Sequence, residues 1–266
     1  EKFFFMLNNA CKMGGKENSF EPAQPQRLGA AERLEKAARD MAALINDICW
    51  DGKWYIRGFG KNAIGTHRNT YGKIFLNSQT WAVISGVARG ERARICMDSV
   101  REYLNSPLGV KLLDPPFDQY DRDHGLISRY VKGRKENGIF AHAQSWAIIA
   151  ECLLGRGDYA FDYYQSILPV KRNEDADILR TEPYVYCQTI SSGDSLFPGQ
   201  GANSWLTGTA SWMYIAATQY ILGIRPGLEG LLIHPCLPMD WGEYRVERTF
   251  RGTRYMIQCK KSGTPR

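Results

Sequence analysis

A histidine, a threonine and a glycine stand at corresponding places in the chain, each shortly before an apolar run. His142 precedes Trp146 by four residues, and Gly208, next to Thr207, precedes Trp212 by the same interval. The first amide groups of a helix lack partners within the helix, and the helix dipole is positive there, so such positions favour anions. His142, Thr207 and Gly208 therefore predict an oxyanion site, with phosphate as the first candidate ligand.

The tryptophans belong to a repeat that predicts how these residues are positioned. Trp81, Trp146 and Trp212 follow Asn-Ser-Gln-Thr, His-Ala-Gln-Ser and Gly-Thr-Ala-Ser, at intervals of 65 and 66 residues. Asn, Ser, Thr and Gly are frequent at helix starts because they satisfy the unpaired amides of the first turn. The repeat length fits two antiparallel helices with long connections, so we expect three equivalent inner helices around an axis.

The spacing of apolar residues separates further helices from loops. Between Ala30 and Ile48 apolar residues recur every three or four positions, which predicts a helix. Other helices are expected at 78–88, 90–104, 143–154, 157–167 and 204–222. Glycine and proline indicate a loop or insertion at 14–29, a turn and short strand at 50–59, and a long connection at 105–141.

The pattern changes near Gly227 to short alternating runs separated by glycine and proline. Such runs are typical of β-strands, because successive side chains of a strand point to opposite faces. The expected strands are Leu231–Ile233, Tyr244–Phe250 and Thr253–Cys259. A mainly helical chain that ends in the start of a β domain is therefore the predicted fold class.

The composition is typical of an ordinary soluble globular protein, with 44% apolar and 23% charged residues. Lysine and arginine are dispersed, so the net charge of +6 indicates a solvated surface and argues against nucleic-acid binding. No run approaches the roughly 18–20 apolar residues of a membrane helix. Seven cysteines without a Cys-x-x-Cys pair favour reduced thiols in a cytoplasmic protein over disulfides or a zinc site.

Six segments form a specific set when they are taken together. They are Trp50–Arg57, Gly72–Trp81, Lys135–His142, Glu182–Gln188, Asn203–Ala210 and Tyr220–Pro226. From about residue 50 onward, the chain resembles the inverting phosphorylases of β-linked disaccharides, the cellobiose and chitobiose phosphorylase family (glycoside hydrolase family 94). The resemblance implies that residues 1–226 are the later part of an (α/α)6 barrel and residues 227–266 the start of a C-terminal β-sandwich.

The resemblance also implies roles for individual residues. His142, Thr207 and Gly208 match phosphate-binding positions of the family. Charged and amide groups suit sugars because they accept and donate hydrogen bonds together. The positions that match sugar-contacting residues are Tyr130, Lys135, Glu136 and Gln188. The resemblance implies neither a metal nor a cofactor. Inorganic phosphate is the implied co-substrate.

Other prominent residues have a simpler structural explanation. We expect Trp146, Trp205 and Trp212 to pack as wedges between helices and not to serve as platforms for sugars. Asp51 is followed by Gly52, and an Asp-Gly turn explains this aspartate without a catalytic role.

The implied activity is reversible phosphorolysis of a cellobiose-like β-disaccharide to an α-sugar 1-phosphate and a free sugar, with inversion. Phosphate replaces the activated water of an inverting glycosidase, so only an acid carboxyl is needed. In the family this acid is the aspartate of a Trp-Asn-Asp motif, which does not occur in these 266 residues, so we expect it upstream of the chain. The expected partners are sugar and phosphate, with a homodimer as the candidate assembly and without nucleic acid or membrane.

Three alternatives remain open at this point. A hydrolase of the glucoamylase kind would need a second carboxylate near His142 and Thr207, and its activity would not depend on phosphate. A phosphorylase-like domain of a larger glucan-synthesising enzyme would set the length of the glucan and would not release a disaccharide. A non-catalytic sugar- or phosphate-binding fragment would fit the absence of the acid motif. The sequence does not distinguish glucose from N-acetylglucosamine as the sugar.

Overall fold

Helices form most of the regular structure in the computed structural model, which describes residues 25–60, 62–122 and 124–260. The α-helices are α2 (Pro25–Ile48), α3 (Leu76–Ser85), α4 (Gly90–Ser99), α5 (Ala141–Leu153), α6 (Gly157–Ser166), α7 (Pro169–Arg172), α8 (Ala176–Leu179) and α9 (Thr209–Ile215). Turns of π-helix extend α4 through Val100–Leu104 and α9 through Ala216–Ile221. None of the described helices is long and apolar enough to cross a membrane.

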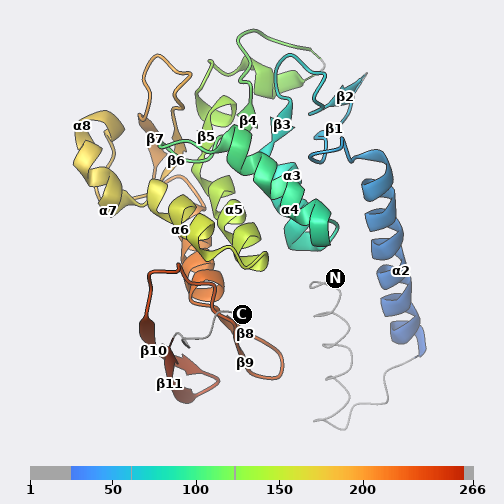
Figure 1. Cartoon of the computed structure of the whole chain (residues 1–266), viewed down its shortest axis with the longest axis vertical. Helices are drawn as coiled ribbons and strands as arrows, with labels where there is room; N and C mark the ends of the chain where they lie inside the picture. Colours follow the sequence, from blue (N-terminus) through green and yellow to red (C-terminus); the bar gives the residue numbers. More distant parts are fainter. Residues whose placement is uncertain (1–24, 61, 123, 261–266) are drawn as a thin grey trace.

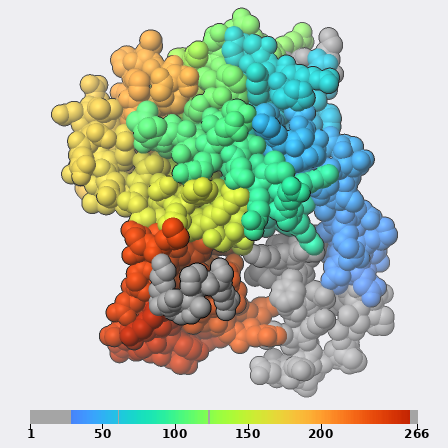
Figure 2. All heavy atoms as spheres, in the orientation of Figure 1, coloured from blue at the N-terminus to red at the C-terminus, as the bar shows by residue number. Residues whose placement is uncertain are grey.

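The strands are short and pair in antiparallel fashion. Near one end of the helices lie β1 (Gly58–Phe59), β2 (Ala63–Ile64), β3 (Ile74–Phe75), β4 (Leu113–Asp114), β5 (Ile139–Phe140), β6 (Cys187–Ile190) and β7 (Gly201–Ser204) (Figure 1). Towards the opposite end lie β8 (Ile224–Pro226), β9 (Leu231–Ile233), β10 (Glu243–Phe250) and β11 (Thr253–Lys260). The space-filling view shows these last strands directly against the helical part (Figure 2).

Helix α5 lies at the centre of the fold, where α3 and α9 pack against it from different sides. Its apolar residues are almost completely buried, as expected for a helix that is apolar all round. Each of α3 and α5 is followed by a helix that packs back on it, α4 and α6 respectively. The three helices that carry the repeated tryptophans are therefore neighbours, as predicted. A closed six-fold toroid and a complete sandwich stay predictions.

The repeated tryptophans make a continuous row of ring contacts across these helices. The ring centroids of Trp81 and Trp146 are 5.3 Å apart, and those of Trp146 and Trp212 are 6.0 Å apart. Both pairs meet edge to face, a favoured arrangement because the positive edge of one ring approaches the negative face of the other. The repeat in the sequence is thus a packing repeat between adjacent helices.

Several element boundaries differ from the sequence predictions. Helix α2 begins at Pro25, so the loop predicted at 14–29 is wrong for its last residues, and 14–24 lie outside the described residues. The helix predicted from residue 204 begins at Thr209, because Ser204 pairs with β6 as the last residue of β7 and residues 205–208 form a bend between the strand and the helix. The β region begins at Ile224, three residues before the expected Gly227.

The predicted capping of α3 and α5 is also wrong. Their N-cap residues are Phe75 and Phe140, the last residues of β3 and β5, which have no side-chain hydrogen bond to the helix. At α3 the Leu76 amide instead donates to the Leu112 carbonyl at 2.8 Å. Strand pairing therefore sets these helix starts, and the polar lead-in residues fall inside the helices.

Two of the lead-in residues are buried glutamines that join the helices to neighbouring loops. The Gln79 amide accepts from the Tyr55 backbone nitrogen at 2.8 Å and donates to the Tyr55 and Phe75 carbonyls. Gln144, the equivalent residue of the next repeat, accepts from the Val110 nitrogen at 2.7 Å and donates to the Tyr163 carbonyl at 2.5 Å. Each amide thereby ties its helix to a backbone amide of a neighbouring loop, which needs a partner in the interior.

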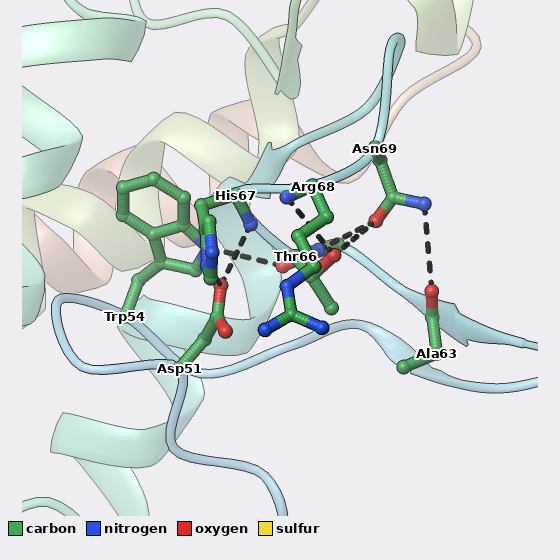
Figure 3. A network of polar contacts seen from close by, with 8 residues as sticks. Asp51, Trp54, Ala63, Thr66, His67, Arg68 and Asn69 are labelled. Atoms are coloured by element: carbon green, nitrogen blue, oxygen red, sulfur yellow. Dashed lines mark hydrogen bonds and ion pairs between the residues drawn. The ribbon is translucent and has the colours of Figure 1, made fainter.

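The segment that Gln79 holds contains a second polar network (Figure 3). Asp51 Oδ2 accepts from the His67 backbone nitrogen at 2.7 Å and contacts its Nδ1 at 2.9 Å. Asp51 also begins a turn, with Gly52 at φ +88° and a Trp50–Tyr55 bridge, so the predicted Asp-Gly turn is present. These contacts fix the loop that supports the start of α3.

At the other end of α5, the carboxyl group of Glu151 is fully buried. Within the described residues neither of its oxygens has a hydrogen-bond partner, and Arg156 Nη1 lies 3.8 Å from Oε2. Burial raises the pKa of Glu151 to about 8, an effect that the Arg156 charge opposes only in part. The buried carboxyl group is therefore largely neutral below this pH.

We predict that Gln144→Leu lowers the free energy of unfolding by roughly 1–3 kcal/mol, because the buried Val110 amide loses its partner while the Tyr163 carbonyl keeps the Ser166 hydroxyl. Urea denaturation of the 266-residue chain measures the change. Gln258→Leu, at an exposed position on β11, is the matched control and should change stability by less than about 0.5 kcal/mol. Equal stabilities of the two variants would contradict the bridging role of Gln144.

Glu151 also predicts how stability depends on pH. Its pKa is higher in the folded than in the unfolded chain, so its stabilising contribution is complete below the unfolded value of 4.5 and disappears as pH rises towards about 8. The melting temperature of Glu151→Gln relative to the parent should therefore increase steadily between these pH values. A difference that does not change with pH, measured by calorimetry, would show that Glu151 titrates normally.

Candidate functional site

The sheet of β5, β6 and β7 is the frame that gathers the predicted site residues. Ile139 and Phe140 of β5 pair with Ile190 and Thr189 of β6, and β6 in turn pairs with β7. Strand β5 runs directly into α5, and a short turn joins β7 to α9. The predicted residues that lie on or next to this frame are Tyr130, Lys135, Glu136, His142, Gln188, Thr207 and Gly208.

His142 and Gly208 are brought into direct contact. His142 is the second residue of α5, and Gly208 immediately precedes α9. A Cβ atom built on Gly208 would lie 3.0 Å from Cε1 and 3.2 Å from Nδ1 of the His142 ring. Such a contact is tighter than most side chains adopt, so glycine lets the turn approach the imidazole closely. The two segments predicted to share one rim therefore do so.

The His142 ring lies among aromatic side chains. Its centroid is 4.9 Å from that of Trp146 and 5.9 Å from that of Trp212, and Phe140 stacks beside it at 6.4 Å. Burial lowers the pKa of His142 below its ordinary value of 6.5, because the charged form loses hydration. Within the described residues, the buried Nε2 atom has no hydrogen-bond partner. This ring nitrogen is therefore a buried polar atom that the described part of the protein leaves unpaired.

Thr207 organises the start of α9. Its hydroxyl oxygen accepts from the Thr209 backbone nitrogen at 3.1 Å and lies 2.6 Å from the Thr209 hydroxyl. The turn is thus fixed by a side chain two residues before the helix, as in other serine and threonine turns. Thr207 and Gly208 are held at a helix start, where the dipole is positive, and Gly208 contacts the imidazole of His142.

Tyr130, Lys135 and Glu136 form one group beside the sheet. The Lys135 ammonium lies 5.3 Å from the centre of the Tyr130 ring, within the range of a cation–π contact. The neighbouring Glu136 carboxylate raises the pKa of the Tyr130 phenol. Lys135 and Glu136 lie in a turn of 3₁₀-helix, Lys135–Asn137. This turn packs against β5 and β6. The structure thus brings these three predicted residues together.

Gln188 lies on β6 opposite the end of β7. Its Oε1 accepts from Asn203 Nδ2 at 3.0 Å, and its Nε2 donates to the Leu206 carbonyl at 3.2 Å. The Leu206 carbonyl immediately precedes Thr207 in the chain. Gln188 therefore links the strand on which it lies to the turn that contacts His142.

Two supporting residues were missed by the sequence predictions. Asn137 is buried, and its side chain donates to the Phe117 and Tyr130 carbonyls at 2.7 and 3.1 Å and accepts from the Phe117 nitrogen. Gly133 adopts φ +72°, and a Cβ there would lie 2.5 Å from the Ser195 backbone nitrogen. The glycine in the sequence could have indicated this close approach, but no local signal indicates that Asn137 is buried.

The described residues offer polar groups for an oxyanion and a sugar, but no metal centre. No cluster of three or more His, Cys, Asp or Glu side chains suitable for a metal occurs among them. The ionisable groups among the predicted site residues are His142, Lys135, Glu136 and the Tyr130 phenol.

Comparison with known proteins identifies relatives of the chain. Residues 23–223 match the family model described as the glycosyl hydrolase 94 superfamily, catalytic domain. An N,N'-diacetylchitobiose phosphorylase from Vibrio proteolyticus is 43% identical, over 95% of this chain and 34% of its own length. A solabiose phosphorylase from Paenibacillus borealis is 41% identical, over 87% of this chain and 30% of its own length.

A third relative is a cyclic β-(1,2)-glucan synthase, NdvB, from Rhizobium meliloti. It is 34% identical over 90% of this chain, which corresponds to 9% of the synthase. The chain thus spans about a third of the phosphorylases it matches and a much smaller part of the synthase.

The environment of His142 predicts how oxyanion binding depends on pH. Sulfate keeps its charge over this range, so its affinity should increase as pH falls through the pKa of His142, below 6.5. Calorimetric titration of sulfate at several pH values measures the effect. His142→Asn keeps a side-chain donor that does not titrate, so its sulfate affinity should be almost independent of pH. The same pH dependence in parent and variant would contradict the prediction.

Proposed function

The chain belongs to the glycosyl hydrolase 94 superfamily, and we propose that it forms the phosphate-binding wall and part of the sugar-binding wall of an inverting disaccharide phosphorylase. The contact between His142 and Gly208 carries this proposal. It joins two helix starts, a hydroxyl and an imidazole nitrogen at one point, a combination suited to an oxyanion. The names of the two phosphorylase relatives support phosphate as that oxyanion.

In the proposed reaction, a phosphate oxygen attacks the anomeric carbon from the face opposite the glycosidic oxygen. That carbon–oxygen bond breaks while an acid carboxyl protonates the departing oxygen. The products are an α-sugar 1-phosphate and a free sugar. Phosphate is itself the nucleophile, so the task of His142, Thr207 and Gly208 is to hold it in line with the bond that breaks.

The acid carboxyl is proposed to come from outside these 266 residues, which contain no Trp-Asn-Asp sequence. Glu136 and Glu182 already have other partners. Glu136 interacts with the Tyr130 phenol, and Glu182 Oε1 accepts from Trp205 Nε1 at 2.9 Å. Their positions suit sugar binding and the support of the site.

For the sugar, the proposal assigns Gln188, Lys135 and Glu136 to hydrogen bonds with hydroxyl groups and Tyr130 to the wall of the acceptor position. These residues present amide, ammonium, carboxylate and phenol groups from adjacent segments of one frame. A barrel built from α/α pairs, followed by a β-sandwich, is the proposed architecture of the whole protein. A cytoplasmic location, a homodimer and independence of metals belong to the same proposal.

We predict that His142→Ala and Thr207→Ala each weaken phosphate binding roughly 10- to 100-fold, since a charge-assisted hydrogen bond contributes about 1.5–3 kcal/mol. Calorimetry on the 266-residue chain measures the affinity, with His67→Ala and Thr218→Ala as controls away from the site. Phosphate-dependent release of sugar 1-phosphate should be assayed in the longest polypeptide that contains the chain. Variants that bind phosphate as tightly as the parent would overturn the proposal, and sugar release without phosphate would favour a hydrolase.

A further inference from the structure

Trp205 lies at the surface of the site, contrary to the expectation that it packs between helices. It lies in the turn between β7 and Thr207, and 66% of its surface is exposed. Trp146 and Trp212, for which the same role was expected, pack against the core. Pairing of β7 with β6 ends at Ser204, so the residue that follows leaves the sheet. Leu206 and Tyr184, which adjoin Trp205, are exposed as well, and an exposed apolar patch of this kind marks a binding surface.

The backbone around Trp205 is held in an unusual conformation. Trp205 has φ +69°, and Asn203 and Lys135, both next to β6, have φ +55° and +50°. Residues other than glycine rarely adopt positive φ, and such strain concentrates at functional sites where the surrounding structure maintains it. The described part of the chain has five non-glycine residues with positive φ, and three of them lie around the candidate sugar site.

The indole ring is anchored along one edge. Its Nε1 donates to Glu182 Oε1 at 2.9 Å. Hydrogen bonds from the Glu182 backbone amide, Ser204 and Trp205 lower the pKa of the Glu182 carboxyl, which keeps it charged as an acceptor. Tyr184 meets the indole edge to face at 6.2 Å and is itself 74% exposed. The ring is thus fixed in position while its surface stays accessible.

From this geometry we propose that Trp205, flanked by Tyr184, is a stacking platform for a pyranose ring of the sugar substrate. The C–H groups on one face of a β-linked pyranose are apolar and pack against the flat indole, while hydroxyl groups at the ring edge require polar partners. Asn203, Gln188 and the Tyr184 hydroxyl provide such partners close to the platform. The identity of the ligand as a sugar rests on the proposed function.

The platform would place the sugar next to the proposed phosphate position, because the two are joined by a short segment of the chain. Leu206 separates Trp205 from Thr207, and its carbonyl accepts from Gln188. A sugar stacked on the indole would therefore lie beside the turn that faces His142. Trp205 would orient the sugar relative to phosphate without taking part in the bond changes.

The test is a titration of the 266-residue chain with two probes, N,N'-diacetylchitobiose and cellobiose, followed by calorimetry and by tryptophan fluorescence. Trp205→Ala should weaken binding of the disaccharide that binds the parent by about tenfold, the effect of losing one aromatic contact of about 1.4 kcal/mol. Trp205→Phe keeps a flat ring and should recover most of the affinity. Phe59→Ala removes an equally exposed ring on β1 and should have no effect.

Phosphate affinity is measured on the same variants and separates the platform from a general disturbance. Trp205→Ala should leave it within about twofold of the parent value. Joint loss of sugar and phosphate binding, unchanged sugar binding in Trp205→Ala, or a parent chain that binds neither disaccharide would each overturn the platform. A change of oligomeric state alone, seen by ultracentrifugation, would instead identify the surface as a protein interface.

The two proposals can fail separately. If neither the parent nor any variant binds phosphate but only Trp205→Ala loses sugar binding, the proposed function fails and the platform stands.

Discussion

Buried amide side chains that bridge backbone segments are the constraint on which this structure depends. Gln79, Asn137 and Gln144 each accept from one backbone amide of a neighbouring segment and donate to at least one backbone carbonyl. The connecting loops are long and have few strand partners, so their polar groups would be unpaired in the interior without these bridges. Gln144 lies two residues after His142 on α5, so its bonds help to fix the helix turn that carries the imidazole.

The environment of His142 determines what kind of anion site the frame can provide. Aromatic neighbours lower its pKa, so near neutral pH the imidazole acts through one neutral nitrogen and not through a full charge. Attraction for an oxyanion must then come from donors at the starts of α5 and α9 as well. Precise positioning of the imidazole and of the backbone donors therefore matters more than net charge. The close contact between His142 and Gly208 holds the two segments together.

Local spacing in the sequence predicted helices well, because apolar periodicity reflects the face that each helix buries. The helices expected near 30–48, 90–104 and 157–167 are present, and Trp81, Trp146 and Trp212 meet as neighbours. Helix starts were wrong where strands intervene, since Phe75, Phe140 and Ser204 are set by pairing with distant segments. Exposure of Trp205 and burial of Asn137 also depend on tertiary contacts, which no local pattern encodes. The predicted site residues nevertheless gather on one frame.

A crystal structure of the 266-residue chain grown with phosphate tests the central claim most directly. Phosphate is predicted beside the contact between His142 and the turn before α9, with its oxygens at about 2.7–3.1 Å from a ring nitrogen of His142 and from the Thr207 hydroxyl. Phosphate bound only at other places, or a site in which the His142 ring has turned away from Gly208, would contradict it.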